Sequence, residues 1–195
     1  MTSLTQDLFG PITEPPLPEG AVLLKNFITQ DQETWLMDRI DAKIWNTGFA
    51  RRRQFYGTRY GNAQEHADSM PSFLVSLGNH LAVQGIFTEP PNQVLINEYL
   101  PGQGIADHVD RTDLSGETVV SLSLLSDVVM DFKPLSSHLG PPRSLILPRF
   151  SLLILQRTAR HQWTHGIAKR LTDTIHGHPL SRHRRVSITY RDPPV

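Results

Sequence analysis

The sequence predicts an α+β protein in which two N-terminal helices lean on an antiparallel β-sandwich or barrel. Apolar residues recur every three or four positions in segments 28–44 and 71–85, a period typical of amphipathic helices. From residue 92 onward, short runs rich in β-branched residues alternate with glycine- and proline-containing turns, as in antiparallel sheets. A chain of 195 residues is long enough to bury the core of one domain.

The first helical segment has a clear start signal. Thr29 is a suitable N-cap, and Gln32 stands three residues later as its capping-box partner. We expect the buried stripe of this helix to comprise Leu36, Ile40 and Ile44. The second helix is expected to begin near Pro71, a residue suited to a first helical turn, and to end near Gly85. Its predicted stripe comprises Leu74, Leu77 and Leu81.

Six segments of the C-terminal half read as strands, namely 93–100, 118–125, 128–133, 144–148, 151–156 and 186–191. The segment between the two helices, 51–70, is polar, aromatic and punctuated by glycine, and we expect surface loops or short strands there. Residues 10–20 are rich in proline and glycine, so residues 1–20 are expected to form an extended N-terminal arm.

Composition excludes several classes of protein. The chain has no cysteine, so disulfides, thiolate zinc sites, iron–sulfur clusters and cysteine nucleophiles are ruled out. The formal net charge is +0, so any contact with a polyanion must come from a local patch. The N-terminus lacks the pattern of a signal peptide, and no apolar run approaches the roughly 20 residues that span a bilayer. We expect a cytoplasmic protein, monomeric and without a membrane contact.

A candidate metal site lies in the segment INEYLPGQGIADHVD. His108 and Asp110 are two residues apart, so on an extended segment both could face one ion. Alone, the pair is also explained by a surface histidine beside an aspartate. The segment RHQWTHGI offers a third ligand, either His165 or His161, and two histidines with one carboxylate are the ligands of non-haem iron oxygenases.

A candidate anion site lies near the end of the chain. Arg185 and Arg191 are six residues apart with β-branched residues between them, so a strand would place both guanidinium groups on one face. Such a pair facing the interior of a sandwich is costly unless it meets an anion, and a dicarboxylate fits because guanidinium binds carboxylate through two parallel hydrogen bonds. A solvated edge-strand face is the alternative.

Taken together, these motifs resemble the AlkB family of iron(II)- and 2-oxoglutarate-dependent dioxygenases. That family carries N-x-Y, then H-x-D beginning eleven residues after the asparagine, a late histidine, and a closing pair of arginines six residues apart. The chain has the same order and spacing in Asn97, Tyr99, His108, Asp110, His165, Arg185 and Arg191. The resemblance runs from about residue 22 to residue 191. It is greatest to the branch that includes tRNA wobble-uridine hydroxylases, through the phrases PGQGI, VSLSL, VVMDFK and R-x-x-W-T-H-G-I, the last beginning at Arg160.

The resemblance implies a fold and a set of roles. Residues 21–195 would form one dioxygenase domain, a double-stranded β-helix (jelly roll) with two flanking N-terminal helices. Iron(II) would be bound by His108, Asp110 and His165, because the metal histidine of the family precedes Gly-Ile; His161 would be a neighbour. Arg185 would pair with the far carboxylate of 2-oxoglutarate, assisted by Tyr99. Asn97 and Arg191 would lie around this cosubstrate, and O2 would be the second cosubstrate of a hydroxylation or an oxidative demethylation.

The resemblance also implies a substrate lid over residues about 46–70. Arginines contact phosphates and aromatic rings stack on bases, so the lid composition suits a modified base in nucleic acid. The candidate substrate-binding residues are Arg51, Arg52, Arg53, Phe55 and Tyr56. Alkylated DNA or RNA repair and tRNA modification remain alternatives, as do a protein or small-molecule substrate and a non-catalytic binding module on the same fold.

Two features depart from the pattern or stand outside it. Ser187 occupies a position where DNA-repair members often have asparagine, which weakens one possible cosubstrate contact. The segment between His165 and Arg185 is expected to be a loop, and its His176 and His178 invite interpretation as a second metal site. We discount that site because loop histidines are usually solvated and the sequence suggests no third ligand.

Overall fold

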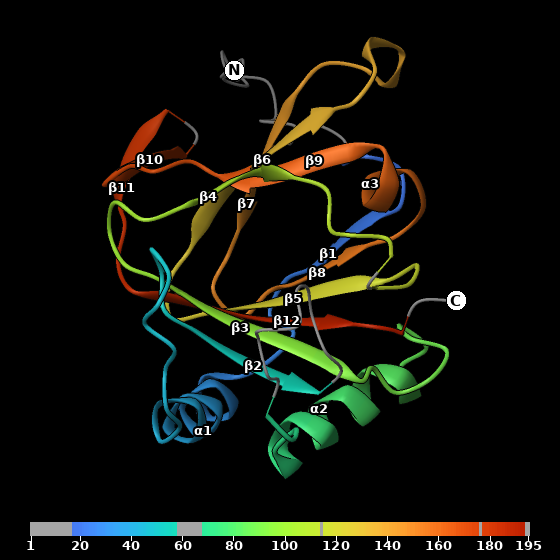
Figure 1. Ribbon diagram of the computed structural model, residues 1–195. Helices are drawn as coiled ribbons and strands as arrows, with labels where there is room; N and C mark the ends of the chain where they lie inside the picture. The colour runs from blue at the N-terminus through green and yellow to red at the C-terminus, as the bar shows by residue number, and fades with distance from the viewer. Residues whose placement is uncertain (1–16, 58–67, 114, 176, 194–195) are drawn as a thin grey trace, which may run out of the picture.

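Two antiparallel sheets face each other and enclose the space in which the candidate site residues lie (Figure 1). The computed structural model describes residues 17–57, 68–113, 115–175 and 177–193. The larger sheet has the strand order β1-β8-β5-β12-β3-β2. Its strands are β1 (Ala21–Leu24), β8 (Leu152–Leu155), β5 (Val119–Leu124), β12 (Arg185–Arg191), β3 (Gln93–Tyr99) and β2 (Arg53–Gly57).

The smaller sheet has the strand order β4-β9-β6-β7. Its strands are β4 (Ile105–His108), β9 (Trp163–Ile167), β6 (Val128–Pro134) and β7 (Arg143–Leu147). A short helix, α3 (Arg157–His161), precedes β9, and a 3₁₀ turn covers Ser137–Leu139. All six predicted strands are found, as β3, β5, β6, β7, β8 and β12. The arrangement is an antiparallel, sheet-rich fold.

Two helices lie against the outer face of the larger sheet (Figure 1). They are α1 (Gln30–Asp41) and α2 (Ser72–Val83), and Pro71 is the N-cap of the second. The predicted capping box is confirmed: the Gln32 N–H donates to Thr29 Oγ1, and the Thr29 N–H donates to Gln32 Oε1. Ile44 was wrongly placed in the buried stripe. It is 94% exposed, because α1 ends at Asp41 and the chain leaves the helical path before reaching it.

Strand alternation gives the larger sheet an apolar outer face, and on β12 it gives a polar inner face. On β12, Val186, Ile188 and Tyr190 belong to the core cluster that packs on the two helices. The intervening residues of the same strand line the space between the sheets, and they are Arg185, Ser187, Thr189 and Arg191. A second core cluster, which includes Phe132, Leu145 and Trp163, lies within the smaller sheet and its contact with the larger one.

The segment between His165 and Arg185 differs from the loop that the sequence suggests. It contains a two-stranded hairpin, β10 (Thr172–Ile175) and β11 (His178–Ser181), with Ile175 paired to His178. Gly177 has φ +81°, a left-handed conformation that glycine adopts at little cost in so tight a turn. His176, residues 1–16 of the expected arm and residues 58–67 of the expected lid lie outside the described residues. In the described part of the chain, no helix is long and apolar enough to cross a membrane.

Candidate metal centre and cosubstrate pocket

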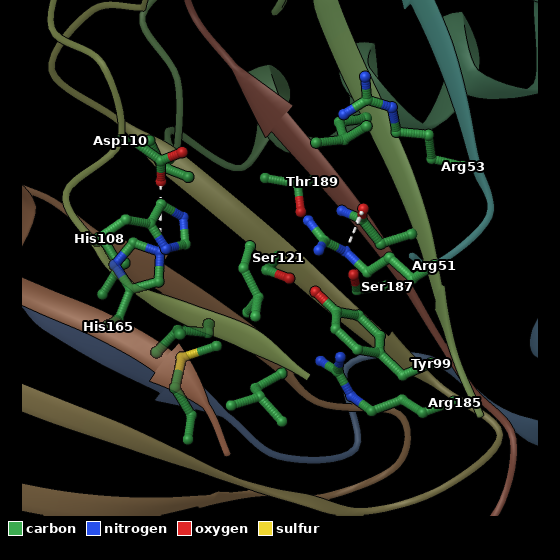
Figure 2. A pocket seen from close by; sticks show the side chains of 18 of the residues that line it. Arg51, Arg53, Tyr99, His108, Asp110, Ser121, His165, Arg185, Ser187 and Thr189 are labelled. Atoms are coloured by element: carbon green, nitrogen blue, oxygen red, sulfur yellow. Dashed lines mark hydrogen bonds and ion pairs between the residues drawn. The ribbon is translucent and has the colours of Figure 1, made fainter. Parts of the chain in front are cut away.

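Three side chains remote in sequence converge on one point between the sheets. His108 and His165 are register partners in the antiparallel pair β4–β9, so the two imidazoles stand side by side, with ring centroids 4.5 Å apart. Asp110 adds a carboxylate, and one ligand atom from each of the three lies within 4.8 Å of the others. Figure 2 shows them grouped on one wall of the pocket. Such a spacing allows all three to bind a single ion.

The position of Asp110 depends on contacts made beyond the end of a strand. The β4–β9 pairing is irregular between Ile105 and His108, and β4 ends at His108, so the ladder does not fix the next residues. The carboxylate of Asp110 is 3% exposed, and its Oδ1 accepts a hydrogen bond from Arg191 Nη2 at 2.6 Å. Its Oδ2 lies 3.5 Å from His165 Nε2. Arg191 therefore holds this carboxylate in the same pocket as the histidines.

The protonation states favour metal binding. Burial alone would raise the pKa of Asp110, but the Arg191 guanidinium and the two imidazoles outweigh it and hold the pKa below its ordinary value. Burial lowers the pKa of His165 to about 4, a change that the Asp110 carboxylate only partly opposes. At neutral pH the carboxylate is thus ionised and the His165 imidazole neutral, the forms in which both groups bind metal ions.

The tautomer of His108 is also suited to a metal. His108 Nδ1 lies 2.9 Å from the carbonyl oxygen of Ala106, which can only accept, so Nδ1 carries the hydrogen and donates it. The lone pair of Nε2 is then free for an ion. His161, the alternative ligand, lies away from this cluster and pairs with Glu117 at 2.9 Å. The donor set of two imidazoles and one carboxylate is that of non-haem iron(II) centres.

A second wall of the same pocket fits a carboxylate. Arg185 is 2% exposed, its Nη2 donates to Ser123 Oγ at 2.8 Å, and its guanidinium lies 5.3 Å from the centre of the Tyr99 ring. Two further donors, Nε and Nη1, have no hydrogen-bond partner among the residues that the structure describes. Burial lowers the pKa of this guanidinium to about 10, so it remains charged at neutral pH. A buried cation with unused donors is a site prepared for an anion.

The metal cluster and Arg185 line one cavity of about 180 Å³, which also receives Asn97, Tyr99 and Ser187. Asn97 is buried, and its Oδ1 accepts a hydrogen bond from Arg51 Nε at 3.0 Å. The cavity therefore contains the predicted residues for both the metal and the cosubstrate. Ser123 was not singled out from the sequence, although it alternates with apolar residues in VSLSL and so faces the interior.

The predicted substrate-binding residues separate into two groups. Arg51 and Arg53 line the cavity (Figure 2). Arg52 points elsewhere: its guanidinium forms an ion pair with the buried Glu98 and lies 4.8 Å from the centre of the Trp45 ring.

The two aromatic residues among those candidates do not line the cavity. Tyr56 is 4% exposed, donates from its hydroxyl to Gln54 Oε1 and belongs to the core under the helices. Phe55 is half-buried on β2, where Arg53 lies 5.7 Å from the centre of its ring. Tyr56 therefore stabilises the fold and has no face free to stack on a base.

A glycine allows β4 and β9 to lie close together beside the two candidate metal-binding histidines. A Cβ on Gly166 would lie 2.3 Å from Asp107 Oδ1 and 3.0 Å from the backbone nitrogen of Asp107. Gly166 immediately follows His165, and Asp107 immediately precedes His108. A side chain at position 166 would displace the Asp107 carboxylate and press on the Asp107 backbone, so the glycine of the WTHGI phrase favours the close approach of β4 and β9 at the two histidines.

Comparison with known proteins agrees with this geometry. The model of the 2OG-Fe(II) oxygenase superfamily matches residues 45–191. The chain belongs to this superfamily and is an oxidoreductase that uses iron(II), 2-oxoglutarate and O2.

Its relatives place it among the AlkB-like members. It is 33% identical over 175 residues to the tRNA (carboxymethyluridine(34)-5-O)-methyltransferase alkbh8 of Xenopus tropicalis, covering 84% of this chain and 27% of that protein. It is 32% identical to the uncharacterized protein L905 of Acanthamoeba polyphaga mimivirus, covering 89% and 84% of the two chains. The solved structure of OsALKBH1 superposes with a TM-score of 0.68 at 17% identity, covering 91% and 99%. The chain spans about a quarter of the ALKBH8 proteins of Xenopus tropicalis and Mus musculus.

Proposed function

We propose that this protein oxidises a modified base in nucleic acid, with iron(II) held by His108, Asp110 and His165. The observation that carries the proposal is the convergence of these three ligands in one cavity with the buried, under-bonded guanidinium of Arg185. When bound, iron(II) and 2-oxoglutarate activate O2, with oxidation of the cosubstrate to succinate and carbon dioxide accompanying hydroxylation of the substrate.

The residues of the chain bind and orient. Arg185 pairs with the far carboxylate of 2-oxoglutarate, with Ser123 fixing the guanidinium and Tyr99 lying beside it. Arg51 does not bind the metal. Its Nε donates to Oδ1 of Asn97, so the NH2 group of that amide remains available to the cosubstrate. Arg191 keeps the Asp110 carboxylate ionised and correctly turned. The apolar lining of the cavity, which includes Leu95, Met130 and Leu153, limits the access of water.

A nucleic-acid substrate is supported by the relatives and by the cavity mouth. The names of the relatives include a tRNA methyltransferase of Xenopus tropicalis and a probable RNA/DNA demethylase ALKBH6 of Danio rerio. Arg51 and Arg53, which belong to the expected lid segment, bring two cations to the cavity. Arginines bind phosphates, so we assign substrate contacts to Arg51 and Arg53, which line the cavity. Arg52 and Tyr56 do not line it, and we no longer assign them such contacts. A target base in a duplex would have to be flipped out to reach the metal.

Further parts of the proposal concern the finer fold and the state of the protein. We propose that residues 21–195 form one domain, that the two facing sheets are the halves of a jelly roll, and that α1 and α2 are its two flanking helices. Residues about 46–70 form the lid. A monomeric protein in the cytoplasm stays a prediction from the sequence.

The test is turnover by purified protein with iron(II), O2 and 2-oxoglutarate. We expect slow succinate release without substrate, its loss in His165→Ala, and its retention in the matched control His161→Ala. Equal loss in both variants would show the ligand assignment to be wrong. Nucleoside mass spectrometry after incubation with methylated oligonucleotides and with whole tRNA then tests the substrate. Succinate release without any altered nucleoside would favour a protein or small-molecule substrate.

A further inference from the structure

The short helix α3 carries a buried guanidinium that neither the metal nor the cosubstrate assignment uses. Arg160 is 2% exposed and is among the largest fully buried side chains of the described protein. It stands at the end of α3, directly before the strand that carries His165. Burying a cation costs several kcal/mol unless its donors find good acceptors. The partners of Arg160 therefore show what this residue holds in place.

Among the described residues, the hydrogen bonds of the Arg160 guanidinium all go to one loop. Nη1 donates to the carbonyl oxygen of Asp110 at 2.7 Å, and Nη2 donates to Ser115 Oγ at 2.8 Å. Longer contacts of 3.4 Å join Nη2 to the carbonyl oxygens of Arg111 and Ser115. None of these acceptors is a carboxylate, and three of the four are backbone atoms. The guanidinium thus holds the backbone in place at Asp110, Arg111 and Ser115.

This loop needs such a contact because it carries a metal ligand beyond the end of a strand. The sheet ladder stops at His108, so the orientation of the Asp110 backbone is left to other contacts. Arg191 holds the Asp110 carboxylate, and Arg160 holds the Asp110 carbonyl. Arg160 also shares one continuous segment, α3 and β9, with His165. One guanidinium therefore ties together the two segments that carry Asp110 and His165.

We propose that Arg160 is a positioning residue of the metal centre: through the Asp110 carbonyl and Ser115 it sets the distance between Asp110 and His165. This inference rests on the proposed metal ligands. Groups that orient metal ligands from behind change metal affinity by about 10- to 100-fold when removed. Lysine keeps the charge but lacks the planar fork that reaches two acceptors at once, and methionine has no donor at all.

The experiment compares Mn(II) affinity with the stability of the metal-free protein. The variants are Arg160→Met and Arg160→Lys, with Arg149→Met as the matched control. Arg149 is a control arginine away from the metal cluster, where it donates to the buried carboxylate of Glu33 on α1. Mn(II) binding to the full chain is measured by electron paramagnetic resonance, and unfolding of the metal-free protein by circular dichroism.

We expect both Arg160 variants to weaken Mn(II) binding by about tenfold or more. Arg149→Met should lower the unfolding temperature of the metal-free protein while its Mn(II) affinity stays within about twofold of the wild type. Arg160 variants that unfold at a lower temperature yet bind Mn(II) as the wild type does would overturn the proposal, because Arg160 would then be a structural residue only.

A further variant and the wild-type protein itself separate the remaining outcomes. If Arg160→Met and Arg160→Lys both fail to fold, Ser115→Ala removes one acceptor and leaves the guanidinium in place. It should weaken Mn(II) binding by about fivefold, the size of one hydrogen bond, and unchanged affinity would count against the proposal. A wild-type protein that binds no Mn(II) would contradict the proposed metal ligands themselves, which is a different failure from that of Arg160.

Discussion

Replacing Arg185 by methionine should separate stability from cosubstrate binding. The side chain is fully buried in the pocket, and two of its donors lack partners in the described residues. Methionine has a similar length and can fill the same space without a charge. We expect the variant to fold at least as stably as the wild type when no cosubstrate is present, and to lose its response to 2-oxoglutarate.

The magnitude follows from the burial of the cation. The pKa of Arg185 falls to about 10, roughly 2.5 pH units below that of a solvated guanidinium, and each pH unit is worth about 1.36 kcal/mol. Keeping the empty site charged therefore costs the folded protein about 3 kcal/mol. The lost hydrogen bond to Ser123 Oγ offsets about 1 kcal/mol of the gain on substitution. A net stabilisation of about 1–2 kcal/mol is expected.

When 2-oxoglutarate is present, the charged Arg185 side chain is favoured over methionine. Removing one partner of a buried, hydrogen-bonded charge pair costs about 2–5 kcal/mol of binding, so the apparent affinity for 2-oxoglutarate should fall by about 30-fold or more. Thermal unfolding with Mn(II), with and without 2-oxoglutarate, measures both effects in one series. A wild-type protein stabilised by 2-oxoglutarate beside a variant stabilised equally would refute the reasoning. So would a variant less stable than the wild type by more than about 1 kcal/mol without cosubstrate.

Three other expectations concern the strands around the pocket. Gly166→Ala should weaken Mn(II) binding by about tenfold and destabilise the protein by about 1–3 kcal/mol, because the new Cβ would meet Asp107 at 2.3 Å; equilibrium unfolding and Mn(II) titration check both. Between pH 6.5 and 4 the metal-free protein should lose about 3 kcal/mol of stability. The depressed pKa of His165 makes the unfolded chain bind more protons in that window, so His165→Gln should show a flatter pH profile in urea unfolding. Arg51→Ala should raise the KM for a nucleic-acid substrate about tenfold, whereas Arg52→Ala should leave KM unchanged and lower only the unfolding temperature; equal KM values for the two variants would count against the lid assignment.

The metal site could be predicted because its ligands are tied to short local patterns. His108 and Asp110 are two residues apart at the end of a strand, and His165 directly precedes a glycine in the segment WTHGI. The pairing of Arg185 and Arg191 on one face follows from the two-residue period of a strand, which the structure shows on β12. Such features depend on nearest neighbours along the chain, and a single sequence contains them.

Other features depend on which strand pairs with which, and a single sequence does not contain that information. The direct opposition of His108 and His165 arises from the β4–β9 register, and the hairpin β10–β11 arises from a turn at Gly177 inside a polar segment. Arg160 precedes the WTHGI phrase in the sequence, but the sequence alone gives it no partner. Only the folded chain brings it to the Asp110 carbonyl.

The consecutive arginines 51–53 divide between two environments, and only two of them line the cavity. Arg53 pairs with Asn97 in the β2–β3 register, so it faces the cavity, and Arg51 reaches the same side. Arg52 lies on the opposite side, where it pairs with Glu98, a residue next to Asn97 that points the other way. A count of cations gives all three arginines the same role, but only Arg51 and Arg53 line the cavity in which a substrate would bind.

The charges around the cavity explain how a protein of zero formal net charge can bind anions. Four arginines line the cavity, namely Arg51, Arg53, Arg185 and Arg191, against one lining carboxylate, Asp110. Arg191 is ion-paired with Asp110, whereas two donors of the buried Arg185 have no partner among the described residues, and a bound iron(II) would add to the positive charge of the pocket. A dianionic cosubstrate offsets part of the excess, so metal and 2-oxoglutarate should each raise the affinity of the other. Arg51 lines the same cavity and donates to the neutral amide of Asn97, and its positive charge there favours an anionic polymer over a neutral small molecule.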